Sequence, residues 1–186
     1  MNYLKDKAVG VDHLIQKAQV QIYDYLNSLG YDIDGYGKCY ITEDEVNGKK
    51  AFIPKFYKGT IADRVQNVSV LFAEGNKFFF TVGKNYNSVS KFLYETDISI
   101  YFIVDLNKAK PSVNHRADSE VHKDCYDIVS RCGFGDFDIE LEIRNVLSDF
   151  KVLGNNSAID TIDIQPYHIF KFKTKSSKFD IRKTCN

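Results

Sequence analysis

Hydrophobic and polar residues alternate strictly along two segments of the chain. The first spans 96–106, and its apolar side carries Ile98, Ile100, Phe102, Val104 and Leu106. The second spans 136–143, and its apolar side carries Phe137, Ile139, Leu141 and Ile143. A period of two is typical of a strand with one face in the core and the other face outward. Both segments therefore predict strands that cover a hydrophobic core.

Two other segments have the period of a helix. Over 11–29 apolar residues recur at steps of three and four, and Gly30 follows where a left-handed residue would end the helix. A second helix is predicted over about 117–132, with Gly133 at its end and an apolar stripe of Val121, Cys125, Ile128, Val129 and Cys132. Because each helix has one apolar stripe, we expect both to pack on one face of the sheet.

Turn residues predict two hairpins. The first covers 43–56, where Asn47-Gly48 suits a type I′ turn and Pro54 favours an edge strand or a projecting arm. The second joins strands at about 68–72 and 78–82 through a turn at 74–76. A polar connection at 83–94 and a last strand at 159–173 complete the pattern.

These elements predict an α+β fold in a single domain, 1–186. Its mixed or antiparallel sheet carries the N-terminal helix and the second helix on one face. The hairpin at 43–56 projects from the sheet as an arm. The polar ends of the chain, 1–10 and 174–186, are expected to be further arms.

Charge and hydropathy narrow the range of partners. The chain has 25 basic and 25 acidic residues and a pI near 6.9, which argues against bulk electrostatic binding to nucleic acid or to a membrane. A net charge of zero permits close self-association. The longest apolar stretches have the length of strands, so no membrane partner is expected.

No nucleophile elbow or phosphate-binding loop is present in the sequence, so we expect neither an enzyme nor a cofactor. Two weaker alternatives use charged or metal-binding side chains. His122 and Cys125 share a helix face, and His115 and Asp118 are near them in sequence, as a metal site would require. A metal-dependent nuclease would instead use the strand carboxylates Asp97, Asp105, Glu140 and Glu142.

An acidic stripe alternates with the apolar residues of 136–143, and it consists of Asp136, Asp138, Glu140 and Glu142. If the apolar residues of this strand are buried, the carboxylates must face away from the core. They then form either a solvated strand face or a surface that faces a channel or a partner. Such a surface would repel DNA phosphates or bind a basic partner.

Four segments, at 102–108, 115–121, 145–150 and 164–170, carry a resemblance to a known family. In this order the chain resembles neck and tail ring proteins of tailed bacteriophages, of the tail-terminator or tail-completion class. The ring proteins of crAss-like phages are the nearest match. The resemblance covers about 95–173.

The resemblance implies a structural protein of the virion, without catalysis or a cofactor. Such proteins form closed rings, typically of six or twelve subunits, that stack below the portal, join head to tail and let double-stranded DNA pass. The hairpin is a natural contact with a neighbouring subunit, through Glu45, Asn47, Gly48, Lys49 and Phe52. A metal-dependent nuclease and a monomeric binding module are the alternatives from other classes.

The cysteines are predicted to be free thiols. Cys125 and Cys132 lie two helical turns apart, a rise of about 10.5 Å, which is too far for a disulfide between them. No CxxC pair involves Cys39 or Cys185. A thiol titration of the denatured protein should therefore count all four cysteines. A count of zero or two would show disulfide pairing.

Overall fold

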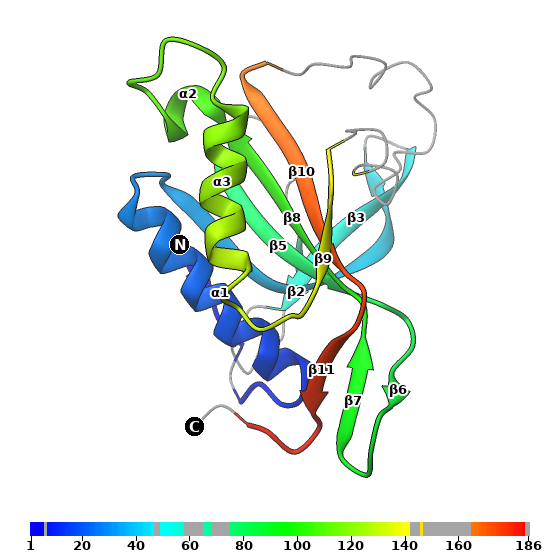
Figure 1. Ribbon diagram of the computed structural model, residues 1–186. Helices are drawn as coiled ribbons and strands as arrows, with labels where there is room; N and C mark the ends of the chain where they lie inside the picture. Colours follow the sequence, from blue (N-terminus) through cyan, green and yellow to red (C-terminus); the bar gives the residue numbers. More distant parts are fainter. Residues whose placement is uncertain are drawn as a thin grey trace.

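Two helices lie side by side on one face of a mixed sheet, and a smaller sheet extends from one end of it (Figure 1). This computed structural model describes residues 1–5, 7–46, 49–57, 65–67, 75–141, 146 and 165–184. The α+β class and the packing of both helices on one face are as the sequence predicts.

The helices are α1 (Val11–Ser28), α2 (Leu106–Ala109) and α3 (Asp118–Val129). The strands are β1 (Asn2–Tyr3), β2 (Ile33–Val46), β3 (Lys49–Tyr57), β4 (Val65–Asn67), β5 (Asn76–Val82), β6 (Asn87–Ser88), β7 (Leu93–Thr96), β8 (Ile98–Asp105), β9 (Phe137–Glu140), β10 (Tyr167–Thr174) and β11 (Ser177–Asp180). Both long helices end at a glycine in the left-handed region, Gly30 (φ 85°) after α1 and Gly133 (φ 77°) after α3. These are the two glycines that the helical pattern marks as stops.

The main sheet has the strand order β4-β3-β2-β5-β8-β10-β9, and β1 pairs with β2 beside this path. The pairs β1–β2 and β2–β5 are parallel, and the other pairs are antiparallel. The sheet is therefore mixed. A separate sheet has the order β11-β7-β6.

Aromatic rings at the centre of the main sheet form the core beneath the helices. Phe102 of β8 lies opposite Phe78 of β5 on one side and Phe170 of β10 on the other. Its ring centroid is 5.8 Å from that of Phe78, 5.1 Å from that of Phe170 and 5.7 Å from that of Phe172. All four side chains are fully buried. The apolar stripes of α1 and α3 cover them.

The opposite face of the central strands is also buried, and here the prediction is wrong. The alternation predicts that Tyr101 and Ile103 point outward. Instead they join a second cluster with Phe79, Ile169 and Phe56. The physical reason is that β2 and β3 bring residues of their own, such as Phe56, against this face.

The second predicted hairpin is also wrong for the strand at 78–82. That strand is part of β5, and both of its edges are taken, by β2 on one side and by β8 on the other. A third strand therefore cannot pair with it at Phe78 and Phe80, where β2 and β8 are both its partners. The residues predicted for its hairpin partner, 68–72, lie outside the described residues. The connection predicted at 83–94 contains β6 and the start of β7.

The two ends of the chain pack against the body, which corrects the expectation of loose arms. At 1–10, β1 pairs with β2, Ala8 is fully buried and Gly10 N donates to Lys183 O at 2.9 Å. At 174–186, β11 pairs with β7 and buries Phe179. Apolar residues within these polar segments, and open strand edges to pair with, account for the difference. The last two residues lie outside the described range.

The Phe102→Ala variant should lose about 3–5 kcal/mol of unfolding free energy, because it leaves a cavity among three packed rings. Urea denaturation followed by circular dichroism would measure the loss. Val89→Ala is the matched control, since Val89 is exposed and its truncation should stay within about 0.5 kcal/mol of the parent. A loss below about 1 kcal/mol for Phe102→Ala would contradict this account of the core.

Candidate assembly surfaces

Strand β2 changes partner along its length, and this change creates an outer hairpin. From Ile33 to Lys38 it pairs with β5, with a register shift before Lys38. From Cys39 to Val46 it pairs with β3. Strand β4 joins β3 only at Lys55–Tyr57. Within the described residues, the part of the hairpin from Ile41 to Pro54 therefore has no strand partner other than its own second half.

The predicted contact residues of the hairpin are placed by backbone register. Glu45 lies opposite Lys50, Lys49 opposite Val46, and Phe52 opposite Glu43. Asn47 and Gly48, the predicted turn, lie outside the described residues. The contact of this hairpin with a neighbouring subunit stays a prediction.

Three aromatic rings pack together at the base of the hairpin, where β2 and β3 join the main sheet. Tyr3 of β1 stacks on Tyr36 of β2 with ring centroids 4.8 Å apart, and Phe56 of β3 lies 5.0 Å from Tyr3 and 4.8 Å from Tyr36. The N-terminal strand thus anchors the hairpin. Sequence reasoning missed this role for Tyr3, because a two-residue strand has no detectable period.

Ion pairs also stabilise the base of the hairpin. Asp12 at the start of α1 lies 2.7 Å from Lys5 Nζ and 3.6 Å from Lys38 Nζ. The Asp12 carboxylate raises the pKa of Lys5 through a hydrogen bond. Lys38 is the last residue of β2 that pairs with β5. The ion pair of Asp12 with Lys38 therefore connects α1 to the start of the hairpin.

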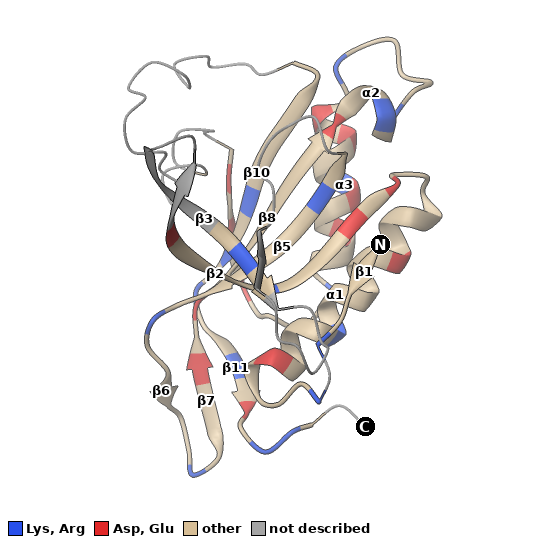
Figure 2. Cartoon of the chain, turned by 180° about the vertical axis from the view of Figure 1, so that it is seen from behind, with Lys and Arg blue, Asp and Glu red and all other residues tan. Residues whose placement is uncertain are grey.

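The acidic stripe lies on β9, the last strand of the main sheet. Asp136 and Asp138 are exposed, Glu140 is half-buried, and Glu142 lies outside the described residues. Figure 2 shows acidic segments on β9 and basic segments on the adjacent β10.

Lysines of β10 lie opposite the carboxylates of this stripe. Asp138 lies opposite Lys173 in the register and 3.3 Å from Lys175 Nζ, and Glu140 lies opposite Lys171. Side chains directly opposite in an antiparallel pair share one face of the sheet. The negative charge is therefore balanced within a few ångströms, well inside the Debye length of about 8 Å. This face is a mixed-charge surface rather than an acidic wall.

The apolar side of β9 is not buried as the alternation predicts. Phe137 is half-buried and packs against Phe172 at 5.2 Å. Ile139 is 40% exposed and Leu141 49% exposed. The physical reason is the position of β9 at the margin of the helix layer: Tyr126 of α3 packs on Phe137, with ring centroids 5.5 Å apart, at the start of the strand. The edge of the sheet thus carries exposed apolar side chains.

A histidine pair connects α3 to β10. His122 Nε2 lies 2.6 Å from His168 Nε2, and Asp118 Oδ1 lies 3.5 Å from His168 Nδ1. The Asp118 carboxylate favours the tautomer with a proton on His168 Nδ1, and in that tautomer His122 Nε2–H donates to His168 Nε2. Burial lowers the pKa of His122, against the opposing effect of the Asp118 charge. Sequence reasoning missed His168, because 46 residues separate it from His122.

Of the four metal ligands considered from the sequence, Asp118 and His122 both lie near His168, whereas Cys125 and His115 do not join them. Cys125 is fully buried in the main core, and His115 Nε2 lies 2.8 Å from Glu120 Oε1. Among the described residues, no group of three or more His, Cys, Asp or Glu side chains is placed to hold a metal ion.

The carboxylates considered for a nuclease are also dispersed. Asp105 caps α2, accepting hydrogen bonds from the backbone N–H groups of Asn107 and Lys108. Asp97 lies before the other end of β8, about 26 Å away along an extended strand. Glu140 belongs to β9, two strands from β8.

Three of the four cysteines are free and buried, as predicted: Cys39, Cys125 and Cys132. Burial raises the pKa of each thiol, that of Cys132 to about 12. They are therefore thiols rather than thiolates at neutral pH, and poor nucleophiles. Cys185 lies outside the described residues.

Comparison of the chain with protein-family models, with curated proteins and with solved structures finds no match in any of the three. Among the described helices, none has the combination of length and apolar character that a membrane span requires.

The stability of the protein should fall as the pH drops from about 6.5, the unfolded pKa of histidine. Below that pH the unfolded chain binds a proton that folded His122 binds less readily, because its folded pKa is lowered. The loss should continue as the pH falls through the folded pKa. Urea midpoints between pH 7.5 and pH 5 would measure it.

His122→Gln is the matched variant for this experiment, because its amide can still donate to His168 but does not titrate. Its stability should fall less between pH 7.5 and pH 5 than that of the parent. Equal losses in the two proteins would show that His122 does not cause the dependence.

Proposed function

We propose that the chain is a structural subunit that assembles with copies of itself into a closed ring. The ring would belong to the neck or tail of a tailed bacteriophage, join head to tail and let double-stranded DNA pass, with six or twelve subunits. The observation that carries the proposal is the outer hairpin of β2 and β3, which extends beyond the strand that holds its base.

The hairpin is suited to strand addition onto a neighbour. Its base is held by the ring stack of Tyr3, Tyr36 and Phe56 and by the ion pairs of Asp12. A rigid base lowers the conformational entropy lost on binding. Main-chain hydrogen bonds from an open strand then supply affinity.

Exposed apolar residues support self-association at two separate places. Tyr40 and Ile41 are exposed on β2 near the hairpin, and Ile139 and Leu141 are exposed at β9. The strand order places the hairpin strands towards one end of the sheet and β9 at the other. Contacts between two different surfaces are heterologous, and such contacts form a ring where the rotation between subunits closes.

Three of the segments that carry the family resemblance meet at one place in the fold. The end of β8 at 102–108 pairs with the start of β10, Tyr167 lying opposite Asp105. Leu106 N donates to Pro166 O at 2.9 Å. His122, which directly follows the segment 115–121, contacts His168. The resemblance therefore concerns one connected unit. The segment 145–150 lies outside the described residues except for Val146.

Shortening the hairpin should abolish assembly without unfolding the subunit. In the test variant Asn-Gly replaces residues 43–52, which keeps the register pair of Thr42 and Ile53 and removes the predicted contact residues. We expect a monomer by light scattering, with circular dichroism like that of the parent. The physical reason is that both described clusters of buried residues lie outside 43–52.

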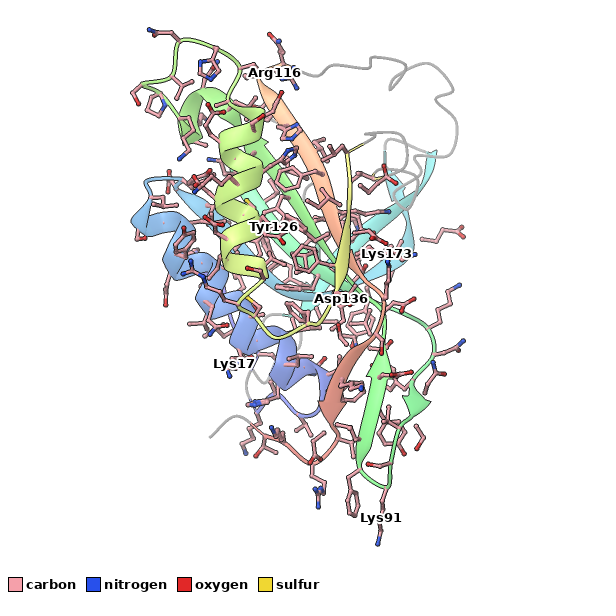
Figure 3. All side chains as sticks on the ribbon, in the orientation of Figure 1. Lys17, Lys91, Arg116, Tyr126, Asp136 and Lys173 are labelled. Carbon is pink, nitrogen blue, oxygen red and sulfur yellow. The ribbon has the colours of Figure 1, made fainter. Side chains whose placement is uncertain are left out.

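The matched control is Lys91→Ala, at the exposed tip between β6 and β7 (Figure 3). It should leave assembly unchanged. Normal assembly of the shortened variant, or its failure to fold, would contradict the role of the hairpin. A parent protein that stays monomeric at all concentrations would contradict the ring itself.

A further inference from the structure

Within the part of the chain that the structure describes, the main sheet has strand edges without a partner at two places. Among the described residues, β10 is the one strand that pairs with β9. In the outer hairpin, Lys49–Pro54 of β3 pairs with β2 alone, because β4 reaches only Lys55–Tyr57. A strand edge presents backbone N–H and C=O groups that another strand can bind. Each copy thus carries two edges that a second copy could extend.

The two edge strands themselves contain charges of opposite sign, although each is paired with a strand that carries counter-charges. Strand β3 contains Lys49, Lys50 and Lys55 and no carboxylate. Strand β9 contains Asp138 and Glu140 and no cation. Opposite charges across a strand pair stabilise it, and like charges directly opposite destabilise it. The charges therefore favour β3 beside β9 over either strand beside its own copy.

Exposed apolar side chains lie on β9 and next to it. Ile139 and Leu141 are exposed large hydrophobic residues, and Tyr126 of α3, next to β9 in Figure 3, is 49% exposed. A strand added to β9 would continue the sheet beneath these side chains. Its own side chains would then cover part of this apolar surface, which favours association.

We propose that the outer edge of β9 in one copy of the chain pairs with Lys49–Ile53 of β3 in the next copy. The inference rests on the proposed ring and names the surface that receives the hairpin. Strand β4 occupies this edge of β3 from Lys55 onward, so the new ladder ends before that residue. The contact uses a different surface on each copy, as a ring requires.

The ion pair already present on β9 does not prevent this contact. Asp138 and Lys175 are 3.3 Å apart, with side chains 69% and 67% exposed. A pair this exposed contributes little to stability. Asp138 can therefore exchange Lys175 for a lysine of the incoming strand, or interact with both.

Cysteine cross-linking tests the contact directly. Ile139→Cys and Ala51→Cys would be combined in a Cys185→Ser background, where the remaining native cysteines are buried. A short bis-maleimide should link the double variant into a ladder of covalent multimers. Either single variant should stay a monomer on a denaturing gel. The control pair, Ile139→Cys with Lys91→Cys, should give no ladder, because Lys91 lies at the far tip of the small sheet (Figure 3).

Charge exchange gives a second readout. Replacing Asp138 and Glu140 by lysines should weaken assembly about tenfold, and so should replacing Lys49 and Lys50 by glutamates. Combining the four changes should restore assembly, because the complementarity is reversed rather than lost. The matched control reverses Lys17 and Lys91, both exposed and outside the two edges, and should leave assembly unchanged.

The outcomes separate this inference from the proposed ring. Assembly of the double-cysteine variant without a ladder, or a dimer from Ile139→Cys alone, would overturn the pairing of β9 with β3 and leave the ring standing. Failure of the four-charge variant to recover would also overturn the pairing. A parent protein that is monomeric by light scattering would overturn both proposals.

Discussion

The stack of aromatic rings across β5, β8 and β10 is the interaction on which the rest of the structure depends. Phe78, Phe102 and Phe170 sit in register on neighbouring strands, and this fixes the order of the three strands. The same rings form the floor on which α1 and α3 pack. With β5 held between β2 and β8, strand β2 is placed beside the core for only part of its length. The hairpin exists because β2 is longer than the edge of β5 to which it binds.

Both candidate assembly surfaces arise where the core ends. The hairpin begins where β2 leaves β5, and its base is fastened by Tyr3, Tyr36 and Phe56 rather than by the main core. At the other end, Tyr126 of the helix layer contacts β9 at Phe137, while Ile139 and Leu141 are exposed. A subunit with a fastened projection at one place and an apolar strand edge at another has the two unlike surfaces that head-to-tail assembly needs.

Charge at these surfaces acts locally rather than through a net field. The chain is neutral overall, and the carboxylates of β9 lie beside lysines of β10. A surface of this kind has a weak potential beyond a Debye length, so it would neither hold nor strongly repel passing DNA. At contact distance the individual charges still distinguish one strand edge from another. That makes them a means of choosing register and partner rather than a source of affinity.

The sequence by itself determined the elements whose signal is local. The apolar stripes of α1 and α3, their glycine stops and the alternation of β8 follow from the period of each segment, and so does the α+β class. Only the tertiary structure decided what lies against each face. It buried Tyr101 and Ile103, exposed Ile139 and Leu141, placed β5 between β2 and β8, and joined His122 to His168. A period of two indicates that the two faces of a strand differ in polarity. Whether a face is buried depends on residues distant in the sequence. For the same reason, the pairing of β2 with β3 could be predicted from the local sequence, whereas the aromatic anchor of the hairpin and the exposed apolar side chains of β9 could not.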